Sequence, residues 1–157
     1  MKRNDRKVLL VFGLDSMDLA RLELMGYEMV IINEENGGGR IRDLIENKGK
    51  PVKGELPDEK VVIFNGYKDE ALQKGVQAIR SSFPVKPIIA AVTDHSYNWT
   101  FEFLLIEHLI QDRDWNRKNA KEYREAMMKE NREEAERLAK EEAELLAKEE
   151  ATKEEGK

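Results

Sequence analysis

Cysteine is absent from the 157 residues of this chain, which excludes disulfides, thiolate metal ligands and cysteine nucleophiles. Long apolar runs are absent too, and no stretch approaches the roughly 18 apolar residues of a membrane-spanning helix. The basic start is followed by an apolar run at residues 8–12 that is too short for a signal peptide. These absences predict a cytoplasmic protein that makes no contact with a membrane.

Excess positive charge is also missing. The formal net charge is -5, which disfavours a surface that binds nucleic acid through its phosphates. Charged residues make up 38% of the chain, well above the usual quarter, and they are unevenly placed. Residues 116–157 hold 11 Lys/Arg and 13 Asp/Glu. This change of composition predicts a domain over residues 1–115 and a charged helical tail over residues 116–157, partly solvated or frayed.

Four short apolar runs are present, near residues 7–13, 28–33, 60–65 and 88–93, and a helical pattern follows each of them. Short runs that are apolar throughout are typical of strands buried on both faces. Strands alternating with helices imply right-handed crossovers in a mainly parallel sheet. The sequence therefore predicts a small four-stranded α/β domain of βαβαβαβα order with a long charged C-terminal helix. A ferredoxin-like order fits less well.

Polar side chains follow each predicted strand. Ligands of open parallel sheets bind beyond the carboxyl ends of the strands, so one ligand edge is a hypothesis. A general acid/base pair of His95 with Asp15 or Asp94 is conceivable there. The same residue types cap helices and close turns, and that structural role is the favoured interpretation. The candidates at this edge are Asp15, Ser16, Asn65, Tyr67, Thr93, Asp94, His95 and Asn98.

Signals for catalysis or cofactors are weak elsewhere. Residues 37–39 are three glycines before a helix, which allows an anion site but lacks the P-loop and dinucleotide spacings. No His, Asp or Glu cluster has metal-ligand spacing, so we predict no metal, no cofactor and no catalytic residue. The loop over residues 47–60 is long for a compact domain, which indicates a mobile or functional segment.

The fourth helix, from about residue 99, is apolar nearly all round. One of its faces carries Trp99, Phe103, Ile106 and Ile110, and the other is also apolar. One face must cover the sheet, and the second needs another partner. That partner is the tail folding back, a second copy or another protein, and a second copy or another protein is the favoured expectation. The interface candidates are Phe101, Leu104, Leu105, His108 and Trp115.

The tail contains an eight-residue repeat, EEAERLAK at 133–140 and EEAELLAK at 141–148. Glu and Lys at i,i+4 favour an α-helix. Eight residues advance the apolar positions by about 80° per repeat, so a heptad coiled coil is weakly supported. A solvated charged helix is the favoured interpretation, and a partner-binding or oligomerising helix is the alternative.

The middle of the chain resembles a known family. The motifs that carry the resemblance are Gly66-Tyr67, Asp69-Glu70, the Pro-led strand at residues 87–93 and Asn98-Trp99-Thr100. Over about residues 60–110 they are similar to a small bacterial family catalogued as domain of unknown function 3783. The resemblance implies no activity, cofactor or catalytic residue. Within the motif, Asn98 and Thr100 are expected to bond the free N–H groups of a helix start.

The leading hypothesis is a non-enzymatic interaction or regulatory module that forms a homo-oligomer, or binds a protein partner, through its fourth helix. The alternative is a small-ligand or nucleotide-binding protein, enzymes included, that uses the carboxyl-end edge of the sheet. The two differ in where they place function, because the first uses a helix surface and the second uses the strand ends.

Overall fold

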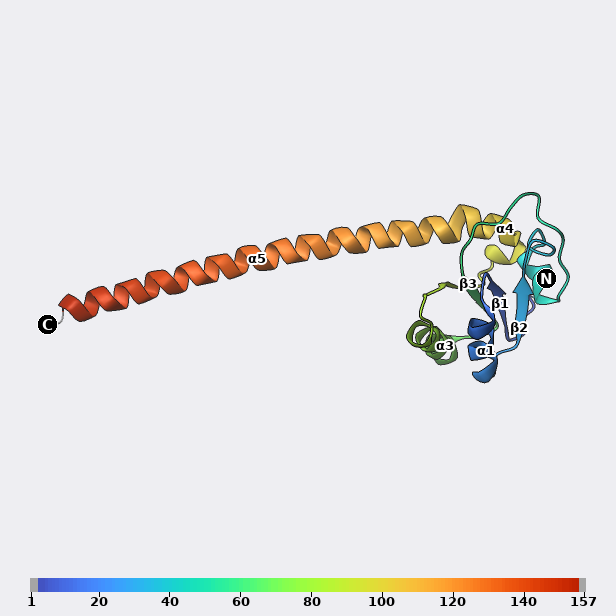
Figure 1. Cartoon of the computed structure of the whole chain (residues 1–157), viewed down its shortest axis with the longest axis horizontal. Helices are drawn as coiled ribbons and strands as arrows, with labels where there is room; N and C mark the ends of the chain where they lie inside the picture. The colour runs from blue at the N-terminus through green and yellow to red at the C-terminus, as the bar shows by residue number, and fades with distance from the viewer. Residues whose placement is uncertain (1–2, 156–157) are drawn as a thin grey trace. The chain divides into compact units, whose positions relative to one another are not determined.

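The computed structural model describes residues 3–155 and confirms the predicted α/β class and the order of the main elements (Figure 1). Four strands alternate with helices, and a long C-terminal helix follows. In chain order the elements are β1 (Val8–Phe12), α1 (Ser16–Leu24), β2 (Met29–Ile32), α2 (Ile41–Ile45), β3 (Val61–Asn65), α3 (Asp69–Ser82), β4 (Ile88–Ala91), η1 (Ser96–Asn98), α4 (Phe101–Leu104), η2 (Leu105–Leu109) and α5 (Ile110–Glu155).

The strands form one sheet in the order β2-β1-β3-β4. The outer pairs, β1 with β2 and β3 with β4, are parallel, as predicted. The central pair is antiparallel, and Leu10 lies opposite Ile63 at its middle. The sheet is therefore two βαβ units side by side that run in opposite directions. This arrangement could not be derived from the element order, which is the same for a fully parallel sheet.

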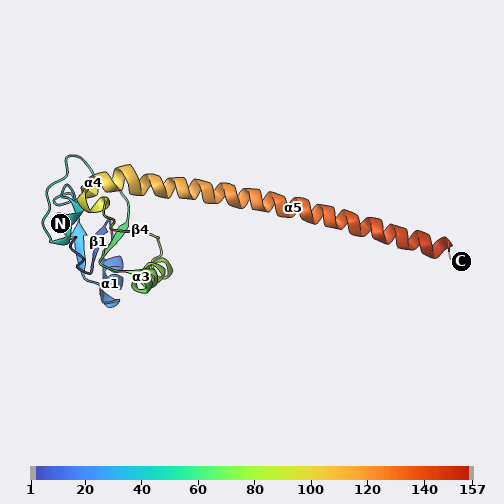
Figure 2. The same cartoon turned by 180° about the vertical axis from the view of Figure 1, so that it is seen from behind.

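Alternate side chains of the two central strands fill two separate cores. Leu9, Val11, Val62 and Phe64 pack with α1 and α3 on one face. Val8, Leu10, Val61 and Ile63 pack with α2 and α4 on the other face. Because both faces are covered, every residue of β1 and β3 has to be apolar or internally bonded. Figures 1 and 2 show α1 and α3 on the side of the sheet opposite α4.

The ends of α1 follow local rules. Asp15 is the N-cap, and its side chain accepts a hydrogen bond from the Asp18 backbone N–H while Asp18 bonds back to the Asp15 N–H, which is a capping box. Gly26 follows the helix at φ +87°, a left-handed conformation that glycine adopts readily. The cap and the glycine fix the two ends of this nine-residue helix, whereas α3 has 14 residues.

The last part of the chain is helical without a break. Thr100 caps α4, its hydroxyl accepting from the Phe103 N–H, and five residues of π-helix then connect α4 to α5. The chain divides into two compact units at Arg113, and each is described by itself below. Of the described helices, none is long and apolar enough to cross a membrane.

Candidate functional site

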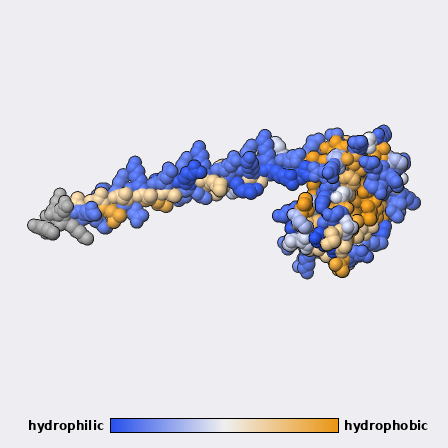
Figure 3. Space-filling model, in the orientation of Figure 1, coloured by the Kyte–Doolittle hydropathy of each residue, from blue (hydrophilic) through white to orange (hydrophobic). Residues whose placement is uncertain are grey.

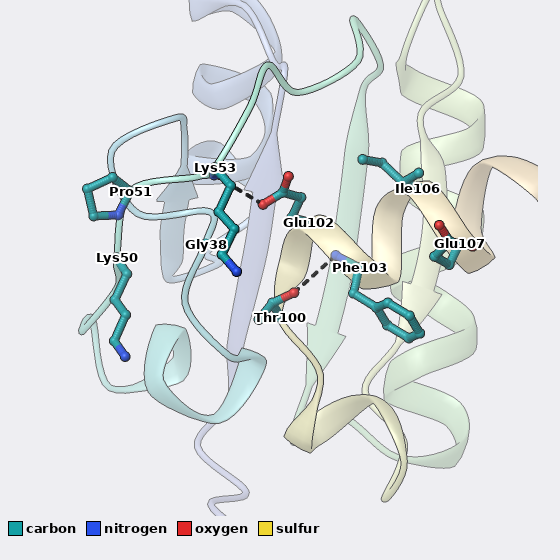
Figure 4. Close-up of a pocket in the computed structure, with 9 residues that line it drawn as sticks. All are labelled: Gly38, Lys50, Pro51, Lys53, Thr100, Glu102, Phe103, Ile106 and Glu107. Carbon is teal, nitrogen blue, oxygen red and sulfur yellow. Dashed lines mark hydrogen bonds between the residues drawn. The ribbon is translucent and has the colours of Figure 1, made fainter.

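A cavity of about 480 Å³ lies beside the start of α4 (Figure 4). One wall is the loop that follows α2, with two lysines, and the other is the α4–η2 segment, with two glutamates and two apolar side chains. The lining therefore mixes opposite charges with exposed apolar surface. The lining residues are Gly38, Lys50, Pro51, Lys53, Thr100, Glu102, Phe103, Ile106 and Glu107.

Backbone bonds hold these two walls together. The Gly38 N–H donates to Lys50 O at 2.8 Å, and the Glu102 N–H donates to Gly37 O at 3.1 Å. The Lys53 N–H also donates to the Glu102 carboxylate at 3.4 Å, as drawn in Figure 4. A Cβ on Gly38 would stand 2.2 Å from Pro51 O, so only glycine allows this close approach. The cavity walls are thus fixed by main-chain geometry.

The same bonds argue against an anion site at the three glycines. The N–H groups of Gly37, Gly38 and Gly39 donate to the carbonyls of Asn33, Lys50 and Asn36, respectively. An anion-binding loop needs free N–H groups that converge on the ligand. These three are engaged within the fold, so the glycines serve chain packing.

An aromatic cluster lies next to the cavity. Trp99 stacks on His108 with ring centroids 4.3 Å apart and planes 12° apart. Phe103 meets both rings edge-on, each with its centroid 5.3 Å away. The π-helical turn between Phe103 and His108 brings these two rings together, and such turns often mark functional positions. Phe103 is 43% exposed and Ile106 is 36% exposed, so this face presents apolar surface to solvent.

The structure divides the predicted edge residues between two ends of the sheet. Because β1 and β3 are antiparallel, Phe12 lies beside Val61 and Val8 lies beside Asn65. The residues after β1 are therefore at the end where β3 begins. Asp15 and Ser16 lie at this end, whereas Asn65, Tyr67, Thr93, Asp94, His95 and Asn98 follow β3 and β4 at the opposite end. An Asp15–His95 pair is contradicted by this arrangement.

Most candidates at the second end have structural partners. The buried Asn65 amide donates to Asn4 O at 3.0 Å and to Arg6 O at 2.8 Å, which fixes the N-terminal segment. The Thr93 N–H donates to the hydroxyl of buried Ser96 at 2.8 Å in a tight turn. Asp94 pairs with Arg3 at 3.1 Å. His95 is exposed. A polar cavity of about 590 Å³ is also found here, and its lining includes Arg3, Arg42, Asp94 and Asn98.

Two further predictions at this end have clear outcomes. Thr100 bonds the first turn of α4, as expected. Asn98 is not the cap, and instead its side-chain oxygen accepts from the Arg42 guanidinium at 3.3 Å. The Tyr67 ring packs edge-on against Phe64 at 5.7 Å, and burial raises the pKa of Tyr67. Tyr67 therefore belongs to the core beside α3.

At the first end, a small ion cluster closes the start of α1. Asp18 is 1% exposed and accepts from Lys60 Nζ at 2.8 Å and from Arg21 at 3.1 Å. The hydrogen bond to Asp18 raises the pKa of Lys60. The hydrogen bond from the Asp18 backbone N–H lowers the pKa of Asp15, and Lys60 adds to this effect. Both pKa shifts follow from hydrogen bonds within the cluster, so the role of the cluster is structural.

Three of the five residues predicted to form an interface lie instead on the buried face of the helix. Phe101, Leu104 and Leu105 are 0–6% exposed and pack against the sheet. The Thr100 cap sets the start of the helix so that this face turns inward, and the opposite face, with Phe103 and Ile106, is left outside. His108 is half-buried beside Trp99. Trp115, in the second unit, is 64% exposed.

Sequence reasoning missed the charged wall of the cavity. Lys50 and Lys53 lie in the loop over residues 47–60, which was flagged only by its length, and nothing in their spacing points to Glu102. A tertiary bridge between Arg40 and Thr100 brings these segments together. Among the side chains that the structure describes, no group of three His, Asp or Glu is placed to hold a metal ion.

Comparison with known proteins confirms the resemblance. Residues 60–115 match the family model described as Domain of unknown function (DUF3783). No curated protein and no solved structure showed a significant match to the chain. The matched segment begins just before β3 and ends after the start of α5, so it contains the second βαβ unit and the aromatic cluster.

Proposed function

We propose that this protein is a non-enzymatic interaction module that self-associates by antiparallel pairing of its C-terminal helix with that of a second copy. The sequence alone placed this self-association on the fourth helix, and the proposal places it on α5. The observation that carries the proposal is a line of exposed apolar side chains along α5, in a segment where charged residues predominate.

This line has a regular period. Met127 and Leu138 are eleven residues apart, as are Ala135 and Leu146. Eleven residues complete three turns of helix, so these side chains stay on one face instead of drifting around it. Figure 3 shows the resulting pale stripe along the hydrophilic helix. The large side chains on this stripe are 39–68% exposed, and they are Tyr123, Met127, Met128, Leu138, Leu145 and Leu146.

The charges beside the stripe select the second copy and its direction. Residues 117–129 carry five basic and two acidic side chains, whereas residues 141–152 carry one basic and five acidic side chains. In an antiparallel pair, the basic part of one helix lies beside the acidic part of the other. A parallel pair would place like charges together. Rim charges contribute little affinity, typically about 0.2–1 kcal/mol each, but they set orientation and partner choice.

Burial of the apolar stripe contributes more to the affinity of the dimer than the charges beside it. Burial of a leucine side chain contributes about 1.5–3 kcal/mol. Each copy contributes the same residues to a two-fold dimer. Leu138 and Leu145 therefore supply four buried leucines per dimer. An isolated charged helix has no such gain, and its ends fray.

Sedimentation of the full-length protein over a range of concentrations tests this proposal. We expect a monomer–dimer equilibrium that weakens at least about 100-fold in Leu138→Glu/Leu145→Glu, because four buried leucines are lost. The matched control is Ala126→Glu/Ala151→Glu, which adds the same charges on the face away from the stripe and leaves association unchanged. Circular dichroism checks that the helix persists in both variants.

Orientation has its own test. Arg117→Glu/Arg124→Glu should weaken the dimer by placing acidic residues beside acidic ones, and Glu142→Lys/Glu149→Lys in the same chain should restore it. A wild-type protein that stays monomeric up to the highest concentration contradicts the proposal. Dimers that ignore both leucine substitutions contradict it equally.

A further inference from the structure

The two βαβ units share more than their topology. Lys7 to Gly13 reads KVLLVFG and Lys60 to Gly66 reads KVVIFNG, with Lys, Val and Gly at the same places. Leu10 and Ile63 occupy the same position in these two segments and lie opposite each other in the sheet. A residue that pairs with its own equivalent in an antiparallel ladder lies on a two-fold axis. The central strand pair is therefore arranged like the interface of a symmetric dimer.

The glycines that end these strands repeat the relation. Gly13 has φ +70° and Gly66 has φ +80°. A Cβ on Gly13 would stand 2.0 Å from Glu59 O, and a Cβ on Gly66 would stand 2.2 Å from Asp5 O. Each glycine thus packs against the segment that enters the other central strand. This reciprocal contact is expected of two equivalent units and is not required of unrelated ones.

The turns after β2 and β4 are built from the same bonds. The Asn33 N–H donates to the Asn36 side chain at 2.7 Å, and the Thr93 N–H donates to the Ser96 side chain at 2.8 Å. Gly37 N–H donates to Asn33 O at 2.8 Å, as Tyr97 N–H does to Thr93 O at 2.9 Å. Different side chains therefore maintain one turn geometry at equivalent positions.

A pair of reciprocal hydrogen bonds lies outside the sheet, where α2 and α4 begin. The Ile41 N–H donates to Trp99 O at 2.8 Å, and the Phe101 N–H donates to Gly39 O at 3.0 Å. Arg40 and Thr100, the N-caps of α2 and α4, form the bridge between these bonds. The three buried residues that follow each cap also correspond, Ile41, Leu44 and Ile45 with Phe101, Leu104 and Leu105.

We infer that the globular unit is a covalently joined pseudo-dimer of one βαβα half-domain. The first half is residues 7–45 and the second half is residues 60–105. The second half, which lies within the segment that the family model matches, is a self-complementary association unit. Its partner is a second copy of the same half, and in this chain the first half takes that copy's place.

The chemistry of the second half fits a copy of itself. Centred on Ile63, the antiparallel register would set Val61 beside Asn65 and Val62 beside Phe64, all of which are buried beside apolar neighbours in the present sheet. The Asn65 amide, which now bonds Asn4 O and Arg6 O, would meet the equivalent carbonyls of the segment before β3. The predicted sheet is β4-β3-β3-β4, with no unpaired central edge.

The test starts from the full-length chain with a protease site placed at Gly54. A side chain there finds no atom within 4 Å, so the loop accepts the insertion. The Leu138→Glu/Leu145→Glu background removes association through the tail, which separates this test from that of the proposed function. After cleavage, the two pieces should remain a one-to-one complex. Unfolding, separation and refolding of the piece that begins after residue 54 should give a homodimer, and adding back the other piece should replace it with the original complex.

Because the chain has no cysteine, a single Ile63→Cys substitution tests directly whether position 63 lies on a two-fold axis. Opposed residues of an antiparallel pair are close enough for a disulfide. In the refolded piece we expect at least about tenfold more covalent dimer with Cys at position 63 than with the matched Ile88→Cys, which lies on the outer strand. In the uncut chain, Leu10→Cys/Ile63→Cys should form one internal disulfide. A refolded piece that stays monomeric or unfolded overturns the inference, and so do equal yields at positions 63 and 88.

Discussion

The first and second halves of the globular unit have the same backbone plan and different surfaces. At matching positions beside the N-caps, the first half has Arg42 and Asp43 and the second has Glu102 and Phe103. These residues line two cavities, a polar one of about 590 Å³ and a partly apolar one of about 480 Å³. The frame is held by buried strands, glycines and turns, so the crevice side chains are free to differ. The two crevices therefore differ in charge and polarity although their frames match.

The two halves also fill equivalent positions of the core with side chains of different size. Val11 and Leu22 fill the core of the first half at positions where the second half has Phe64 and Gly75. A Cβ on Gly75 would come within 2.6 Å of the Tyr27 hydroxyl and 2.7 Å of the Phe64 ring, so these two rings together require the glycine. The first half has its larger side chain on the helix and the second half has it on the strand, so the total side-chain volume at the two positions is conserved.

The largest effect is expected where the halves agree. Gly13→Ala and Gly66→Ala should each lower the free energy of unfolding by about 3 kcal/mol or more, because a Cβ at a positive φ also meets a backbone carbonyl. Guanidinium unfolding followed by fluorescence measures this. Gly26→Ala is the control, since it has a positive φ but open space, and it should cost only about 1 kcal/mol. Unequal effects of the first two variants would break the equivalence of the halves.

A smaller effect tests the exchanged volumes. Phe64→Val should cost about 2–4 kcal/mol by opening a cavity, and Gly75→Leu should cost about 2–3 kcal/mol by overpacking. The double variant recreates the pair found in the first half, so its cost should be at least about 1 kcal/mol less than the sum of the single costs. Thermal and denaturant unfolding of all four proteins completes the cycle. Strict additivity would show that the two positions do not share one volume.

The smallest effect concerns a difference between the halves. Asp18 is buried, whereas the second half has the exposed Ala71 at its place. Asp18→Ala should cost about 2 kcal/mol near neutral pH, because Lys60 loses its main partner. Glu23→Ala, an exposed acid on the same helix, should stay within about 0.5 kcal/mol of the wild type. An equal cost for both variants would remove any special role of the ion cluster.

The pH dependence of the same variant sharpens this prediction. The pKa of Lys60 is raised in the folded state, so its contribution to stability is complete below its unfolded pKa and is lost as pH rises through the folded value. The wild type should therefore lose stability in strongly alkaline solution, and Asp18→Ala should show a smaller loss over that range. Unfolding measured from pH 8 upward reads this difference. Parallel pH profiles for the two proteins would contradict the assigned pairing.

Local patterns predicted the elements well. The four apolar runs and the Thr100 hydroxyl bond follow from periodicity and capping, which act over a few residues. The repeated Lys-Val and Gly in the segments at 7–13 and 60–66 was also readable, and it is the signal that pointed to the two halves. The outward face of α4 was predicted wrongly, because two apolar faces compete and the cap and π-helical turn decide between them.

The sequence by itself determined the α/β class, the order of strands and helices and the charged character of the tail, since burial period and composition are local properties. Only the tertiary structure decided that β1 and β3 run antiparallel, because strand direction depends on pairing between distant segments. That one pairing separated Asp15 from His95. It also set Leu10 opposite Ile63 on the axis that relates the two halves.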